Sequence, residues 1–189
     1  MQSFYIFVEI HLPLKTILDT HKFNVVIDRL AHQLIENHGQ FTESVLIGIQ
    51  PRGVFLADRI VNYIQRLQKI SVLYGKLDIT FYRDDLHSSN ELHLPDNTEI
   101  NFSIEGKNVV LIDDVLFTGR TIRCALDALV DFGRPRKVEL LTLIDRRFSR
   151  QLPIQPDYTG QTIDSMNTQK VKVYWKEKDG KDEVILLGG

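Results

Sequence analysis

The fold of this 189-residue chain is decided by the stretch Val109-Val110-Leu111-Ile112-Asp113-Asp114-Val115-Leu116-Phe117-Thr118-Gly119-Arg120-Thr121. It opens with four apolar residues, a run too short for a buried helix and β-branched enough for a strand covered on both faces. Two acids follow at the carboxyl end of that strand. Gly119 allows the chain to turn without steric penalty, and residues 122–130 continue at helical spacing. In open α/β sheets, ligands bind at this edge.

The turn after the acids has the composition of an anion site. It consists of Thr118, Gly119, Arg120 and Thr121. Backbone N–H groups at the start of a helix, threonine hydroxyls and the positive end of the helix dipole all suit a dianionic phosphate. Asp113 and Asp114 are acceptors for vicinal sugar hydroxyls, so the run predicts a site for a ribose 5-phosphate. The alternative is a simple helix N-cap, but the length of the full run favours the ligand site.

A second strand–turn–helix unit precedes the first. Residues 45–49 are apolar, and residues 54–64 carry apolar side chains at helical spacing. The turn between them is Gln50, Pro51, Arg52 and Gly53. Because a guanidinium binds phosphate oxygens bidentately, Arg52 beside flexible glycine backbone indicates a pyrophosphate site, with an ordinary turn as the alternative.

Strands and helices alternate along the rest of the chain. Residues 25–35 have helical periodicity, and residues 77–82 and 138–144 read as strands. The alternation predicts an α/β fold with a doubly wound, mostly parallel sheet and helices on both faces. The last strands, within residues 171–187, are expected to form a hairpin that turns at residues 179–180.

Two segments outside the sheet are expected to cover the site. The polar segment 87–101 is long for a compact domain, so it predicts a flexible lid loop at about residues 83–107. The lid begins at Tyr82, Arg83, Asp84 and Asp85. Residues 145–160 are expected to be irregular and to form, with the rest of the chain to residue 189, a small hood.

Composition indicates one enzyme-sized domain, residues 15–189, after an N-terminal extension of residues 1–14. No apolar span reaches the roughly 18 residues that a membrane helix needs, and the apolar start has no basic leader, so we expect a cytoplasmic protein. The single cysteine, Cys124, excludes an intramolecular disulfide. A net charge of −2 neither supports nor excludes binding to nucleic acid.

The run 109–121 resembles the 5-phosphoribosyl-1-pyrophosphate (PRPP) signature of type I phosphoribosyltransferases at every position. The resemblance narrows to the PyrR family, the pyrimidine operon regulators with uracil phosphoribosyltransferase activity. It is carried by residues 17–19, 29–32, 75–86, 128–135 and 152–160. In the pyrophosphate turn, Gln50-Pro51-Arg52 departs from the usual Lys-Thr-Arg, and residues 145–153 are one residue longer than the family pattern.

The resemblance implies the type I phosphoribosyltransferase fold and the conversion of uracil and PRPP to UMP and pyrophosphate. Mg²⁺ would be held mainly by PRPP, with no protein ligand directly predicted. Asp113 and Asp114 would hold the ribose and act in catalysis, the turn 118–121 would hold the 5-phosphate, and the turn 50–53 would receive pyrophosphate.

The resemblance also implies a regulatory activity. Family members bind UMP or UTP and then a hairpin in the leader mRNA of the pyrimidine operon, and they form homo-oligomers. Arg29 and His32 match the helix that faces RNA in the family, and Arg146 adds a cation. Two alternatives stay open: an RNA-binding regulator that has lost catalysis, and a phosphoribosyltransferase for another nucleobase, such as a purine.

Overall fold

The computed structural model describes residues 13–83 and 98–188, which form two compact units. The larger unit comprises residues from Asn24 to Ser165, and the smaller one combines residues 13–23 with residues 166–188. Of the expected N-terminal extension, residues 1–12 lie outside the described residues. Within the described ranges, no helix has the length and apolar character that spanning a membrane requires.

The larger unit is built on a five-stranded parallel sheet in the order β3-β2-β4-β5-β6. The strands are β2 (Ser44–Ile49), β3 (Leu73–Leu77), β4 (Asn108–Leu116), β5 (Lys137–Arg147) and β6 (Tyr158–Asp164). The helices are α1 (Thr20–His38), whose first four residues belong to the smaller unit, α2 (Gly53–Gln68) and α3 (Arg120–Leu129), with 3₁₀ turns η1 (Thr80–Tyr82) and η2 (Val130–Phe132). The predicted doubly wound parallel sheet is confirmed.

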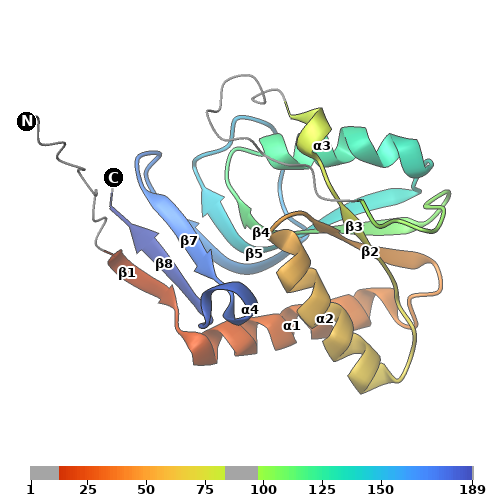
Figure 1. Ribbon diagram of the computed structural model, residues 1–189, viewed down its shortest axis with the longest axis horizontal. Helices are drawn as coiled ribbons and strands as arrows, with labels where there is room; N and C mark the ends of the chain where they lie inside the picture. The colour runs from red at the N-terminus through yellow and green to blue at the C-terminus, as the bar shows by residue number, and fades with distance from the viewer. Residues whose placement is uncertain (1–12, 84–97, 189) are drawn as a thin grey trace, which may run out of the picture. The chain divides into compact units, whose positions relative to one another are not determined.

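Helices cover both faces of this sheet, as Figure 1 shows. The face toward α3 buries Val45, Ile47, Val109 and Leu111 against apolar side chains of that helix. On the opposite face α2 approaches so closely that a Cβ on Gly48 would lie 2.9 Å from the Cβ of Ala57. Both faces of β2 and β4 are therefore buried, which explains their near-continuous apolar sequence.

Two predicted boundaries in the sheet were wrong. The third strand covers residues 73–77 and not 77–82, because residues 80–82 close a 3₁₀ turn that Asp78 stabilises by accepting hydrogen bonds from Thr80. The segment 145–160 is not irregular throughout, since β5 runs to Arg147 and β6 begins at Tyr158. The sequence analysis did not predict β6, because this edge strand has alternating burial and contains polar residues.

The expected lid does not extend as far as residue 107, because residues 99–104 are held against the rest of the fold. Glu99 pairs with Lys76 through two backbone hydrogen bonds of 2.8 and 3.1 Å, Ile104 is fully buried, and Ile100 and Phe102 pack on the core. Residues 84–97, which include the predicted site residues Asp84 and Asp85, lie outside the described residues.

The smaller unit is a three-stranded antiparallel sheet in the order β1-β8-β7. Its elements are β1 (Pro13–Leu18), β7 (Lys170–Tyr174), α4 (Lys176–Asp179) and β8 (Glu183–Leu187). The predicted hairpin is confirmed, with the short helix α4 at its turn. Trp175 is fully buried here and packs edge-on against Phe23, with ring centroids 5.1 Å apart. Residues 145–165 of the expected hood belong to the larger unit instead.

Candidate active site

Two acids from β4 and a cation from the turn before α2 meet at the carboxyl end of the sheet. Asp113 and Asp114 are each 8% exposed, and Asp114 Oδ2 accepts a hydrogen bond of 3.1 Å from Arg52 Nε. Asp113 Oδ1 accepts one of 2.9 Å from the Asp114 backbone N–H. The parallel pairing of β2 with β4 brings the two predicted turns to the same edge.

Burial controls the charge of both carboxyls. Burial, together with the smaller effect of the neighbouring Asp114 carboxylate, raises the pKa of Asp113 to about 8. The pKa of Asp114 is also raised by burial, although the Arg52 guanidinium opposes this shift. A ligand that donates hydrogen bonds or brings positive charge would favour the ionised forms of this pair.

Gly53 sets how closely the turn before α2 approaches the acids. A Cβ at this position would lie 2.4 Å from the Ile112 carbonyl oxygen and 3.0 Å from Asp113 Cα. Only glycine fits such an approach. Pro51 in the same turn follows a cis peptide bond with Gln50. The predicted residues 50–53 therefore lie directly against the end of β4.

The predicted phosphate turn is residues 118–121, and this turn together with the preceding Phe117 is called the phosphate loop below. Gly119 adopts φ +93° as the N-cap of α3, and no side chain caps the helix there. Backbone N–H groups of the first helical turn can thus serve a ligand. The loop opens onto a cavity of about 270 Å³. Its lining comprises Arg83, Asp113, Val115, Leu116, Phe117, Thr118, Gly119, Arg120, Thr121, Ile122 and Cys124.

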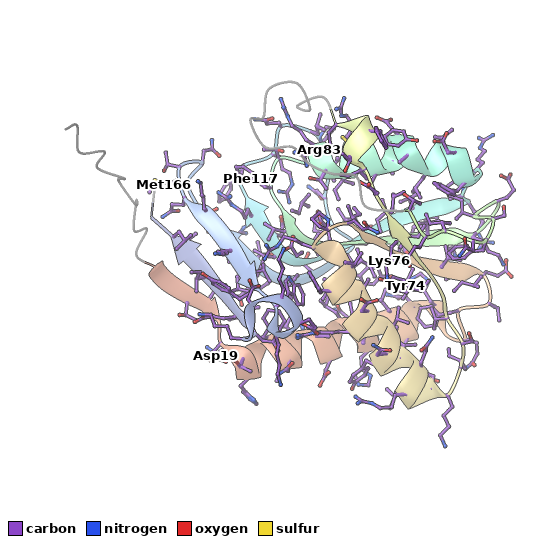
Figure 2. All side chains as sticks on the ribbon, viewed as in Figure 1. Asp19, Tyr74, Lys76, Arg83, Phe117 and Met166 are labelled. Carbon is purple, nitrogen blue, oxygen red and sulfur yellow. The ribbon has the colours of Figure 1, made fainter. Side chains whose placement is uncertain are left out.

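The described start of the expected lid also reaches this cavity. Arg83 lines it, and Figure 2 labels Arg83 and Phe117 on the same side of the larger unit. The preceding residue, Tyr82, donates a short hydrogen bond from its hydroxyl to the Asp131 carboxylate in η2. This bond raises the pKa of the Tyr82 hydroxyl. Arg83, the phosphate loop and Asp113 therefore line the same cavity.

Sequence reasoning missed the residues that support the phosphate loop from the chain after β5. Arg150 donates to the carbonyl oxygens of Leu116 and Phe117, and Gln151 accepts a 3.0 Å hydrogen bond from Arg120 Nε. The sequence signal was ambiguous, because an arginine that binds backbone has the same sequence appearance as an arginine at the surface.

The three residues predicted to contact RNA lie in different environments. Arg29 is exposed but donates to the carbonyl oxygens of Thr159 and Gly160. His32 is exposed, and its Nε2 lies 3.0 Å from the Tyr63 hydroxyl. Arg146 is only 4% exposed, which argues against a surface contact with RNA.

Arg146 has an internal role near the cavity. Its guanidinium lies 3.9 Å from the ring centroid of Phe117, and its Nε donates to Ser165 Oγ over 2.8 Å. Burial lowers the pKa of this side chain. The residue therefore supports a wall of the cavity.

The exposed surface of α1 and α2 holds a cluster that sequence reasoning did not identify. His32 packs edge-on against Tyr63, with centroids 5.6 Å apart, and the Arg66 guanidinium carbon lies 5.6 Å from the Tyr63 ring centroid. Cations and aromatic faces together suit nucleic-acid phosphates and bases. Helical spacing could have indicated that Tyr63 and Arg66 share a face of α2.

Comparisons with known proteins give consistent results. Residues 13–178 match the model of the phosphoribosyl transferase domain family. The chain is 48% identical over 171 residues to the bifunctional protein PyrR of Picosynechococcus sp., which covers 90% of this chain and 96% of the relative. It is 45% identical over 173 residues to the protein of that name from Elusimicrobium minutum, covering 92% and 96% of the two chains.

Solved structures agree on the fold. A hypoxanthine phosphoribosyltransferase from Staphylococcus aureus has a TM-score of 0.69 at 21% identity and covers 93% of each chain. A hypoxanthine-guanine phosphoribosyltransferase from Bacillus anthracis has a TM-score of 0.66 at 19% identity, covering 92% of this chain and 98% of its own.

Proposed function

Because the chain belongs to the phosphoribosyl transferase family and, within it, to the PyrR proteins, we propose that it transfers ribose 5-phosphate from PRPP to uracil. The supporting observation is one cavity that contains the phosphate loop, Asp113 and Arg83. In this reaction the bond between uracil N1 and ribose C1′ forms while the bond from C1′ to pyrophosphate breaks. The proton of N1 is released, and the products are UMP and pyrophosphate.

The residues around the cavity and the turn before α2 take separate roles in this proposal. The phosphate loop binds the 5-phosphate through backbone N–H groups and threonine hydroxyls. Asp113 and Asp114 accept hydrogen bonds from the ribose hydroxyls. Arg52 and Gly53 receive the pyrophosphate, and the Arg52–Asp114 ion pair links the two subsites. Arg83 closes the cavity over the leaving group.

Catalysis in this proposal needs no protein nucleophile. Positive charge develops at C1′ as the bond to pyrophosphate breaks, and the buried carboxylates stabilise it where water is excluded. Orientation of uracil against PRPP supplies the rest. Asp113 must be ionised for this role, so we propose that substrate binding lowers its pKa from about 8.

The proposal includes Mg²⁺ as a partner of PRPP. Oxygen ligands suit this hard cation, and the pyrophosphate and sugar oxygens of PRPP supply them, with the carboxylates of Asp113 and Asp114 nearby. When bound, the cation would neutralise charge on the leaving pyrophosphate.

The enzymatic proposal is tested by assaying the purified chain with PRPP, Mg²⁺ and, separately, uracil, orotate, hypoxanthine or guanine. We expect UMP from uracil alone, and none from the Asp113→Asn, Asp114→Asn double variant. Turnover with hypoxanthine or guanine but not with uracil would support the alternative of a purine enzyme. A folded protein that is silent with every base would reject catalysis.

We also propose regulation through RNA, with UMP or UTP as the effector and the leader hairpin of the pyrimidine operon as partner. The relatives are named bifunctional. The supporting observation on this chain is the surface cluster on α1 and α2 in which the half-buried Tyr63 lies between the exposed His32 and Arg66. A homo-oligomer in the cytoplasm is part of this proposal.

Gel shifts with the operon's leader hairpin, with and without UMP, test the regulatory proposal. We expect UMP to strengthen binding and rising salt to weaken it, since phosphate contacts release counterions. Tyr63→Ala should weaken RNA binding by about tenfold through lost stacking and leave uracil turnover unchanged. RNA binding that is unaffected by UMP and by Tyr63→Ala would reject the regulatory proposal. Sedimentation velocity measures the oligomeric state.

A further inference from the structure

The chain after β5 turns back toward the phosphate loop. We infer that Arg150, in this returning segment, is a positioning residue that holds the phosphate loop in its anion-binding conformation without contacting the substrate. The inference rests on the proposed function, because it concerns how PRPP and UMP are held by their 5-phosphate.

The guanidinium of Arg150 bonds to the backbone on three sides. Nη1 lies 3.2 Å from the Leu116 carbonyl oxygen, 2.5 Å from that of Phe117 and 3.0 Å from that of Arg146. Nε donates over 2.9 Å to the Ile154 carbonyl oxygen, and Nη2 donates to the Asp145 carboxylate. One side chain therefore joins the end of β4, the end of β5 and the segment that follows β5.

Residues next to Arg150 continue this support. The backbone N–H groups of Gln151 and Leu152 both donate to the Thr118 carbonyl oxygen, over 3.0 and 3.3 Å. The Arg120 side chain donates in turn to Gln151 Oε1 over 3.0 Å. Phe117, Thr118 and Arg120 of the phosphate loop are thus all hydrogen-bonded to Arg150 or to the residues that follow it.

The fit around Gly119 is equally close. A Cβ on Gly119 would lie 3.2 Å from Ile154 Cδ1 and 3.4 Å from Leu152 Cβ, so the same segment packs directly against the turn. Donors aimed at an anion are effective only when their positions are fixed before the ligand arrives. Because Arg150 binds carbonyl groups at the start of the loop, it restrains the loop without occupying the N–H groups that would bind an anion.

Arg150 itself is poorly placed to bind a phosphate. Each of its three guanidinium nitrogens already donates to the protein, and the Asp145 carboxylate lies against its charge. Its side chain is 21% exposed, whereas that of Arg147 is 55% exposed and pairs with Asp164. Arg147 therefore offers a matched control, because it is the same residue type three positions earlier, at the end of β5, and makes no contact with the loop carbonyls among those above.

The test compares the full-length wild type with Arg150→Met, Arg150→Lys and Arg147→Met. Calorimetry measures the affinity for UMP and for pyrophosphate, and kinetics give KM for PRPP and for uracil. For Arg150→Met we expect UMP affinity to fall and KM for PRPP to rise by about tenfold or more, because displaced donors bind the phosphate poorly. Pyrophosphate affinity and KM for uracil should change less than about twofold, as should every value for Arg147→Met.

The variant Arg150→Lys distinguishes a positioning role of Arg150 from a direct interaction of its charge with the phosphate. A lysine ammonium cannot reach the separated carbonyl groups as a planar fork does, so we expect Lys to fail to restore UMP affinity. Hydrogen exchange of the backbone amides at residues 118–121 should accelerate about tenfold in both variants, with the central strands still protected. If Arg150→Met is less stable, this measurement still distinguishes a local effect on residues 118–121 from general unfolding, because general unfolding would also expose the central strands to exchange.

Two results would overturn the inference: UMP affinity in Arg150→Met equal to that in Arg147→Met, or full rescue by Arg150→Lys, which would make Arg150 a direct charge partner. Failure of the proposed function is a different result. The wild type itself would then bind no UMP and show no uracil turnover.

Discussion

Asp113 is buried at a position proposed to bind the ribose, where its charge is unfavourable for folding. Burial and Asp114 raise the pKa of its carboxyl from 3.8 to about 8, so the folded protein holds this proton more tightly than the unfolded chain does. Folding stability from this group is therefore greatest near pH 4 and is lost as the pH rises toward 8. A site that keeps such a carboxyl sacrifices stability for ligand binding.

The variant Asp113→Asn tests this relation. Because asparagine stays neutral, we expect it to raise the free energy of unfolding relative to wild type at pH 8 and to change it little at pH 4. The same variant should weaken UMP binding. Urea denaturation at both pH values measures the effect, and Asp127→Asn, at an exposed position of α3, is the control. Equal effects of Asp113→Asn at the two pH values would contradict the assignment.

His38 is a second buried group whose charge depends on its neighbours. Its Nδ1 lies 2.9 Å from Ser44 Oγ, and its Nε2 lies 3.0 Å from Glu139 and 3.1 Å from the Tyr158 hydroxyl. Burial lowers the pKa of His38 and Lys137 adds to this shift, while Glu139 opposes it. The unfolded chain therefore binds this proton more readily, and stability falls as the pH drops below about 6.5.

The variant His38→Gln should reduce that acid sensitivity. We expect it to be less stable than wild type at pH 7.5, because buried hydrogen bonds are lost, and to lose less further stability than wild type between pH 7.5 and 5.5. His21→Gln, at an exposed position of the same helix, should keep the wild-type pH dependence. Parallel stability curves for wild type and His38→Gln would reject the assignment.

At the scale of elements, the approach of α2 to β4 fixes the geometry of the site. The first residue of α2 is Gly53, which lies against the backbone at Ile112 and Asp113. Arg52, one residue earlier, bonds to Asp114 from this position. The helix and strand must therefore stay at this separation for the acids and the pyrophosphate turn to meet.

We expect Gly53→Ala to separate these elements. A Cβ 2.4 Å from the Ile112 carbonyl oxygen must displace backbone, which should lower stability by about 2 kcal/mol or more. Uracil turnover should fall as well. Gly180→Ala is the control, because a Cβ at this glycine would meet open space although its φ is +77°. This variant should lower stability by only about 1 kcal/mol and should not affect turnover. If Gly53→Ala had the same stability and turnover as Gly180→Ala, the close approach of α2 to β4 at Gly53 would be contradicted.

At the scale of the whole molecule, the residues proposed to bind the substrate come from several elements of the larger unit. Arg52, Arg83 and the stretch from Asp113 through the phosphate loop lie far apart in the sequence and meet only when the parallel sheet is formed. A ligand that binds them all is bound only by the folded unit. Binding should therefore stabilise the fold by mass action.

UMP at 100 times its dissociation constant should raise the free energy of unfolding by about 2.7 kcal/mol. For a chain of this size, that corresponds to a rise in Tm of roughly 5–10 °C. Circular dichroism measures the shift, and uridine at the same concentration is the control, because it has no phosphate for the loop. An equal shift with uridine would contradict the role of the phosphate loop.

Sequence patterns alone predicted the alternation of strands and helices and placed the proposed site in one contiguous stretch from Asp113 to Thr121. These features depend on local periodicity and on neighbouring residues that one strand and one turn present together. Other features became visible only in the folded molecule: the pairing of Arg52 with Asp114 across 62 residues, the antiparallel pairing of β1 with β8, the burial of Arg146 and the bonds of Arg150 to the phosphate loop. Each of these depends on contacts between distant segments, and a charged or polar residue in a sequence does not reveal whether it will face water or a backbone carbonyl group.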